Sequence, residues 1–159
     1  MANYDVAQIC TNGHVANAYT KLMPDRGGAY CQTCGEKTIT VCPKCRHEIQ
    51  GPYQGAFVPD SDFEPPNFCR NCGKPYPWTE RRLQAAKELI DQEQTLAPDE
   101  KIALEADIND ITHDAPRTQA AAIRIKAFLA KVPGVVGSAL RDIVVDVASE
   151  TAKKIILGP

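Results

Sequence analysis

The sequence YCQTCGEKTITVCPKC, residues 30–45, contains two pairs of cysteines, and two residues separate the members of each pair. A tight turn of this spacing can direct both thiolates toward one metal ion. Glycine follows the second cysteine of the first pair at Gly35, where such a turn often needs a positive φ. The segment therefore predicts two metal-binding turns joined by a short strand, KTITV.

The remaining cysteines extend this pattern in both directions. FCRNCG, residues 68–73, contains a third pair of the same spacing, and ICTNGH, residues 9–14, contains a cysteine and a histidine separated by three residues. An incomplete site would leave a reactive thiolate pair, and Cys10 with His14 supplies the partner that one pair otherwise lacks. The eight predicted metal ligands are Cys10, His14, Cys31, Cys34, Cys42, Cys45, Cys69 and Cys72.

Eight ligands are enough for two tetrahedral Zn²⁺ ions, one bound by three thiolates and an imidazole and the other by four thiolates. Consecutive pairing, which we favour, leaves room for a β-hairpin in each unit. Nested pairing would join the two central pairs, and a cross-brace would interleave the pairs. His47 lies beside the second set, but the ligand count is complete without it. Because four protein ligands leave no position for water, we predict structural zinc rather than catalytic zinc.

Composition divides the chain near Trp78. Residues 1–78 contain all seven cysteines, eight of the twelve prolines and nine of the ten aromatic residues, which is typical of loops and short strands. Residues 79–159 lack cysteine and are rich in Ala, Ile, Leu, Glu and Lys, which favours helices. We therefore predict an α+β chain, with a tandem zinc-ribbon module over residues 1–78 and an α-helical bundle of three to four helices over residues 79–159.

Cap and turn residues place the helix boundaries. Thr79 is the predicted N-cap of a first helix that ends near Leu96, Pro98 opens a second helix and Pro116 opens a third. PGVVG, residues 133–137, is predicted to break the chain before one last helix, whose apolar residues recur at helical spacing. The apolar surface of this last helix could also support a homodimer.

Bulk properties exclude several classes of protein. The formal net charge is -2 and the pI is about 5.9, so no overall positive field favours nucleic acid. No stretch of about 18 uncharged apolar residues predicts a transmembrane segment. The start of the sequence has no charged-then-apolar leader, and paired cysteines suit metal binding in a reducing compartment, so we expect a cytoplasmic protein. Without a phosphate loop, an H-E-x-x-H helix or a G-x-S-x-G turn, we expect no enzyme activity.

The cysteine motifs resemble the zinc-ribbon superfamily, in which C-x-x-C-G and C-P-x-C flank a short polar strand. The longer run of ICTNGH, YCQTCGEKTITVCPKC, PPNFCRNCGKPYPWT and LRDIVVDVASETAKKI resembles an uncharacterised bacterial family with tandem zinc ribbons followed by a helical C-terminal region. The resemblance implies metal binding, and it implies no activity.

We predict a non-catalytic protein-interaction module that acts as an adaptor or regulator. Aromatic residues in or beside the second ribbon are candidate anchors for a protein partner: Tyr53, Phe57, Phe63, Phe68, Tyr76 and Trp78. The alternative is nucleic-acid binding, and the basic residues available for it are Lys37, Lys44, Arg46, Arg70 and Lys74. A lesser alternative is a RING-like cross-braced domain that recruits a conjugation enzyme, and this requires interleaved ligand pairs.

Overall fold

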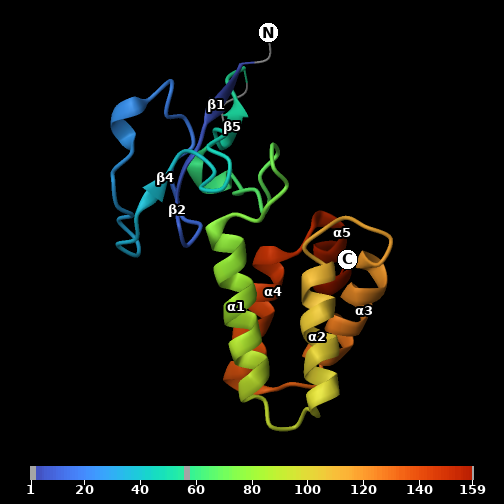
Figure 1. The fold of residues 1–159 in the computed structure, drawn as a ribbon. Coiled ribbons are helices and arrows are strands. Elements are labelled where there is room, and N and C mark those ends of the chain that lie inside the picture. The colour runs from blue at the N-terminus through green and yellow to red at the C-terminus, as the bar shows by residue number, and fades with distance from the viewer. Residues whose placement is uncertain (1–2, 56–57, 159) are drawn as a thin grey trace. The chain divides into compact units, whose positions relative to one another are not determined.

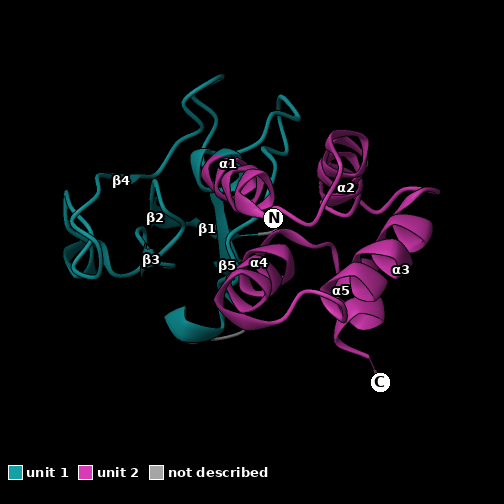
Figure 2. Ribbon diagram, turned by 90° about the horizontal axis from the view of Figure 1, so that it is seen from below, with its two compact units in different colours: residues 1–80 teal, residues 81–159 magenta. Residues whose placement is uncertain are grey.

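The computed structural model describes residues 3–55 and 58–158 (Figure 1), and the predicted anchor Phe57 lies outside these residues. The chain divides into two compact units, residues 1–80 (unit 1) and residues 81–159 (unit 2), which Figure 2 colours separately. Short antiparallel strands come first along the chain, and five α-helices follow them in the described residues. The predicted α+β class is therefore confirmed.

Unit 1 consists of very short elements joined by turns. Its described strands and single-turn helices are β1 (Tyr4–Val6), β2 (Gln8–Cys10), β3 (Val15–Asn17), η1 (Pro24–Arg26), β4 (Thr38–Ile39), β5 (Gln50–Tyr53) and η2 (Asp60–Asp62). The strand β2 lies between β3 and β4 in one antiparallel sheet. The strand β4 falls within the predicted KTITV strand. In the described residues, the strand β5, which lies between Cys45 and Cys69, pairs with β1 and not with a neighbouring strand along the chain.

The core of unit 1 is small and includes two of the predicted ligands. Its buried residues are Ala7, Ile9, Cys42, Ile49, Cys69, Tyr76 and Trp78. The rings of Tyr76 and Trp78 stack with their centroids 4.6 Å apart. The indole Nε1 of Trp78 donates to the carbonyl of Pro66 at 2.9 Å, so this large side chain is buried with its polar atom satisfied.

The helix α1 (Pro77–Gln92) begins two residues before the predicted N-cap, Thr79. Proline has no N–H to leave unpaired, so Pro77 suits the first helical position. The carbonyl of Tyr76 accepts from the N–H groups of Thr79 and Glu80 at 3.0 and 3.1 Å. The hydroxyl of Thr79 donates to the carbonyl of Asn67 at 2.9 Å, so it fixes a neighbouring loop and does not cap the helix.

Unit 2 contains the rest of α1 and the helices α2 (Pro98–Asp110), α3 (Thr118–Leu129), α4 (Gly134–Val147) and α5 (Glu150–Leu157). The helix α3 packs against both α2 and α5. The guanidinium of Arg124 on α3 donates to both carboxylate oxygens of the buried Asp107 on α2, at 2.8 and 2.5 Å. No helix of the described residues is both long enough and apolar enough to cross a membrane.

The predicted last helix is two helices, so the prediction of three to four helices is one too low. The chain is extended at Ala148, and the hydroxyl of Ser149 accepts from the N–H of Ala152 at 3.3 Å, which caps α5. The N–H of Ser149 donates to the carbonyl of Ile111 at 2.8 Å. The cap at Ser149 and its hydrogen bond to Ile111 therefore end α4, although the apolar periodicity of the sequence continues past this point.

The PGVVG segment starts α4 and does not only precede it, because the helix begins at Gly134. A Cβ atom built on Gly137 would lie 2.0 Å from the carbonyl oxygen of Val132. The glycine therefore allows the chain before the helix to fold back against its first turn.

Candidate metal centres

The first cluster, which we call cluster one, joins the end of β2 to the turn that follows the loop of η1. Its members are Cys10, His14, Cys31 and Cys34, whose ligand atoms all lie within 4.8 Å of one another. The Sγ of Cys10 lies 3.4 Å from the Nδ1 of His14 and 3.8 Å from the Sγ of Cys34. The Sγ of Cys31 lies 3.7 Å from the same Nδ1. Imidazole and thiolates therefore converge on one point.

The second cluster, which we call cluster two, joins the turn after β4 to the turn before α1. Its members are Cys42, Cys45, Cys69 and Cys72, again with all ligand atoms within 4.8 Å of one another. The Sγ of Cys42 lies 3.9 Å from that of Cys72, and the Sγ of Cys45 lies 3.6 Å from that of Cys69. Since Cys42 and Cys69 belong to the core of unit 1, this cluster lies at the centre of the packing.

These distances fit the edges of a metal-centred tetrahedron. Two sulfur ligands of a tetrahedral Zn²⁺ lie about 3.8 Å apart, and a sulfur and an imidazole nitrogen lie about 3.5 Å apart, given bond lengths of about 2.3 and 2.0 Å. A disulfide would require about 2.0 Å between sulfurs, and all seven cysteines are free. Each cluster could therefore hold one metal ion.

The structure brings all eight predicted ligands together in two groups of four. The grouping is the consecutive one, so it agrees with neither the nested nor the cross-braced pairing. His14 is in cluster one, whereas His47 is in neither cluster. The backbone carbonyl of His47 accepts from the N–H of Cys42 at 2.8 Å, so this residue supports the turn through its main chain.

The three C-x-x-C turns share one backbone pattern. The N–H of the first cysteine donates to the carbonyl five residues later, and the N–H four residues later donates back to that cysteine, at 2.7–2.9 Å for Cys31, Cys42 and Cys69. The residue that follows the second cysteine has a positive φ, as predicted for Gly35 (76°), and Gly73 adopts the same conformation (71°). In the middle turn this residue is Arg46, with φ 65°.

Substitutions at these positive-φ positions test the backbone strain at Arg46. A non-glycine residue in the left-handed region costs about 1–2 kcal/mol, partly offset by the lower entropy that glycine would lose on folding. We expect Arg46→Gly to raise the free energy of unfolding of the metal-loaded protein by up to about 1 kcal/mol. Gly35→Ala should lower it by about 1 kcal/mol, because nothing lies within 4 Å of the added Cβ and only the backbone is strained. Urea unfolding measures both changes.

Lys44→Gly is the matched control, because Lys44 lies in the same turn as Arg46 but outside the positive-φ region. Glycine at that position should be neutral or destabilising. Equal stabilisation by both substitutions would contradict a strain specific to Arg46.

Hydrogen bonds to sulfur lower the pKa of Cys31 in cluster one and the pKa of Cys45 and Cys69 in cluster two, which favours the thiolate form. Burial alone would raise the pKa of Cys69, but the backbone N–H groups of Cys72 and Asn71, together with the neighbouring thiols, lower it to about 6. Burial is likewise outweighed at Cys31, whose pKa falls to about 6. The thiolate is the form that binds metal, so each cluster holds a thiol that ionises near neutral pH.

Sequence reasoning missed Asn12, which supports a predicted ligand. Its side-chain Nδ2 donates to the Sγ of Cys34 at 3.4 Å, and the backbone N–H of His14 donates to the Sγ of Cys10 at 3.3 Å. Donors of this kind orient metal ligands and reduce the charge on sulfur. The only signal in the sequence is that Asn12 lies between two ligands.

The acidic loop near η2 forms no site in the described residues. Asp60 pairs with Arg26 at 2.5 Å and accepts from the N–H of Ala18 at 3.1 Å, so its carboxylate connects this loop to η1 and to the residue that follows β3. Ser61 donates to Asp62 at 3.1 Å. These carboxylates serve the structure of the loop.

The fold and the two clusters define a small α+β protein in which two groups of four Cys and His ligands precede a helical region. The chain belongs to a bacterial family described as "Uncharacterized protein conserved in bacteria (DUF2321)", whose profile matches residues 3–156. No curated protein and no solved structure matches the chain.

Proposed function

We propose that each cluster binds one structural Zn²⁺ and that the chain is a tandem zinc-ribbon protein acting by binding and not by catalysis. The observation that supports this is the closed ligand set: each group supplies four donors at tetrahedral spacing. A catalytic zinc usually has three protein ligands and an open position for water, whereas a structural zinc has four. Thiolate and imidazole ligands suit Zn²⁺ better than Mg²⁺ or Ca²⁺.

The role we propose for the zinc-bound module is protein interaction. Nucleic-acid binding is less well supported, because residues 1–78 carry seven basic and seven acidic residues. Seven thiolates binding two Zn²⁺ would add about three negative charges to this balance. The described ligand groups are consecutive, so they also lack the interleaved order that a cross-braced recruitment domain requires. A single protein contact does not require the extended positive track that a polyanion does.

Metal content tests the first part of the proposal. Native mass spectrometry of protein purified without added metal should show two zinc ions per chain. Cys10→Ser with Cys31→Ser should remove one ion by breaking cluster one, and Cys45→Ser with Cys72→Ser should remove the other. One zinc in the unaltered protein, or another metal in its place, would contradict the proposal.

A capture experiment tests the second part. Zinc-loaded protein immobilised in bacterial lysate should retain a defined protein that resists nuclease treatment. Retained nucleic acid, with proteins released by nuclease, would instead support nucleic-acid binding.

A further inference from the structure

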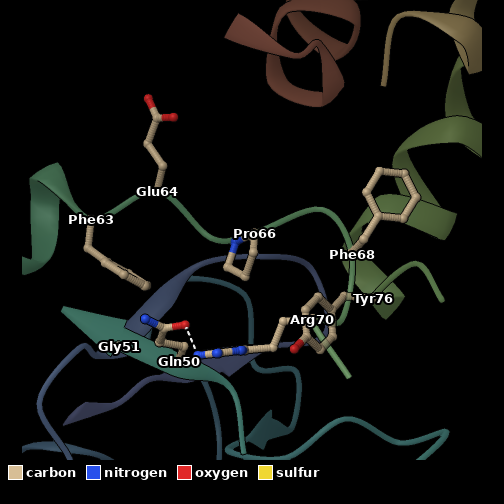
Figure 3. A pocket seen from close by; sticks show the side chains of 8 residues that line it. All are labelled: Gln50, Gly51, Phe63, Glu64, Pro66, Phe68, Arg70 and Tyr76. Atoms are coloured by element: carbon tan, nitrogen blue, oxygen red, sulfur yellow. Dashed lines mark hydrogen bonds between the residues drawn. The ribbon is translucent and has the colours of Figure 1, made fainter. Parts of the chain in front are cut away.

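A pocket of about 250 Å³ opens beside cluster two, between β5 and the segment that leads to the last cysteine turn (Figure 3). Its apolar lining comes from Phe63, Pro66, Phe68 and Tyr76. Figure 3 shows Phe63 and Pro66 pointing toward β5, whereas the carboxylate of Glu64 points away from the hollow. The pocket therefore presents aromatic and prolyl surface without an acidic group directed into it.

The polar end of the pocket consists of Gln50 and Arg70. The guanidinium of Arg70 donates to the Oε1 of Gln50. A guanidinium has only donors, so the amide oxygen must face it and the amide NH₂ of Gln50 is directed elsewhere. Arg70 forms no ion pair with any carboxylate of the described residues. The donors left over are the remaining N–H groups of Arg70 and the NH₂ of Gln50, and such a set recognises a carboxylate.

The size of the pocket limits what can bind. Pockets for drug-sized ligands start at about 300 Å³, so a hollow of about 250 Å³ accepts little more than one residue of a peptide. Because the apolar wall and Arg70 line the same small hollow, one ligand residue must supply both an apolar group and a carboxylate. A C-terminal residue with an apolar side chain does so, since both groups are attached to one Cα.

We propose that the Phe63–Arg70 pocket binds the C-terminal residue of a partner protein, with its apolar side chain against Phe63 and Tyr76 and its α-carboxylate on Arg70 and Gln50. This rests on the proposed interaction function and names the chemistry of the partner. Nucleic acid fits the same pocket less well, because two other cations of unit 1 are already paired with carboxylates: Lys44 with Glu80 at 3.5 Å and Lys21 with Glu48 at 3.3 Å.

The experiment is a titration of small probes into the zinc-loaded full chain, in which binding is measured from amide chemical shifts. The probes are N-acetyl-phenylalanine, N-acetyl-phenylalaninamide, N-acetylglycine and N-acetyl-aspartyl-phenylalaninamide. N-acetyl-phenylalanine should shift the amide signals of residues 50–51, 63–64 and 67–70. It should bind about tenfold more tightly than each of the other probes. Of these, the amide lacks the carboxylate, N-acetylglycine lacks the apolar side chain, and the aspartyl probe has its acid in a side chain and not at the C-terminus.

Two variants test whether the polar end of the pocket causes the preference for the acid over the amide. Arg70→Gln should bring the acid and amide probes to equal affinity, and Gln50→Glu should do the same by occupying Arg70 internally. Lys74→Gln is the matched control, because it removes a charge from the segment after the same turn but does not line the pocket; it should keep the tenfold preference. All variants should retain two zinc ions.

Equal binding of the acid and the amide by the unaltered protein, or an undiminished preference in Arg70→Gln, would overturn the proposal. Tighter binding of the aspartyl probe would mean that the pocket recognises internal acidic segments. Shifts of the same residues by an oligothymidine but not by N-acetyl-phenylalanine would mean that it binds nucleic acid. Either result would also overturn the proposal. Zinc content is measured on the same samples. Two zinc ions per chain with no preference for the acid would mean that only the pocket proposal is wrong, whereas fewer than two ions would mean that the metal sites are incomplete.

Discussion

Removing zinc with a chelator at neutral pH is expected to unfold unit 1 and to leave the helices of unit 2 folded. Two ligands of cluster two, Cys42 and Cys69, belong to the core of unit 1, which has few other large residues besides Ile49, Tyr76 and Trp78. Structural zinc contributes about 10–16 kcal/mol of apparent free energy in small domains, more than such a core could replace. Unit 2 has a separate core of thirteen buried residues and no ligand.

Tryptophan fluorescence can follow this partial unfolding. Trp78, its only tryptophan, is fully buried in the core of unit 1, so its fluorescence should shift to longer wavelength when zinc is lost. Helical circular dichroism should decrease only slightly, and added zinc should restore the fluorescence. Cys45→Ser with Cys72→Ser should reproduce the shift more strongly than the same changes at Cys10 and Cys31. Buried emission from protein shown to be zinc-free would contradict the prediction.

The candidate metal ligands could be predicted from the sequence because the geometry of their turns is local. A C-x-x-C turn is specified by its own residues, and the structure shows the same backbone hydrogen bonds in all three turns. Counting identified Cys10 and His14 as the missing half of one set, but it left three ways of pairing the turns open, and the structure shows the consecutive one. Arg46 could not be predicted to adopt a positive φ, because its residue type favours other conformations and only the repeated turn imposes this one.

The strand pairing and one helix break were not predictable in the same way. The strands β1 and β5 pair across more than forty residues of sequence, and strands of two to four residues are too short to show a period of two. The break between α4 and α5 depends on the carbonyl of Ile111, which comes close to Ser149 only after the helices have packed. Local periodicity continues through Ser149, so the sequence favoured one helix where tertiary contacts produce two.

Replacing Asp5 is expected to give the largest loss of stability outside the metal sites. This carboxylate is 2% exposed and joins β1 to two other segments. Its oxygens accept from four N–H donors: the backbone of Val6 (2.7 Å), Lys21 (2.7 Å) and Leu22 (3.2 Å), and the side chain of Gln54 (3.1 Å). Asp5→Ala leaves these donors unpaired, and each buried unpaired group costs about 1–3 kcal/mol before relaxation. We expect the free energy of unfolding to fall by about 3–5 kcal/mol, measured by urea unfolding in excess zinc.

The same contacts make the contribution of Asp5 depend on pH. Burial would raise its pKa, but the hydrogen bonds from Lys21, Val6, Gln54 and Leu22 outweigh burial and lower it. A carboxyl group whose pKa is lower in the folded state stabilises the fold above its unfolded value of about 3.9, and this stabilisation is lost as the pH falls through the folded value.

The stability difference between the unaltered protein and Asp5→Asn should therefore be constant above about pH 5 and should shrink below about pH 4. Asp25→Asn, which removes the charge of an exposed acid in the same unit, is the matched control for the loss of one carboxylate. A comparison at equal zinc occupancy separates this effect from protonation of the cysteines, because zinc release affects both proteins alike. A difference that grows as the pH falls would mean that Asp5 is protonated in the folded protein and that its four donors are satisfied in another way.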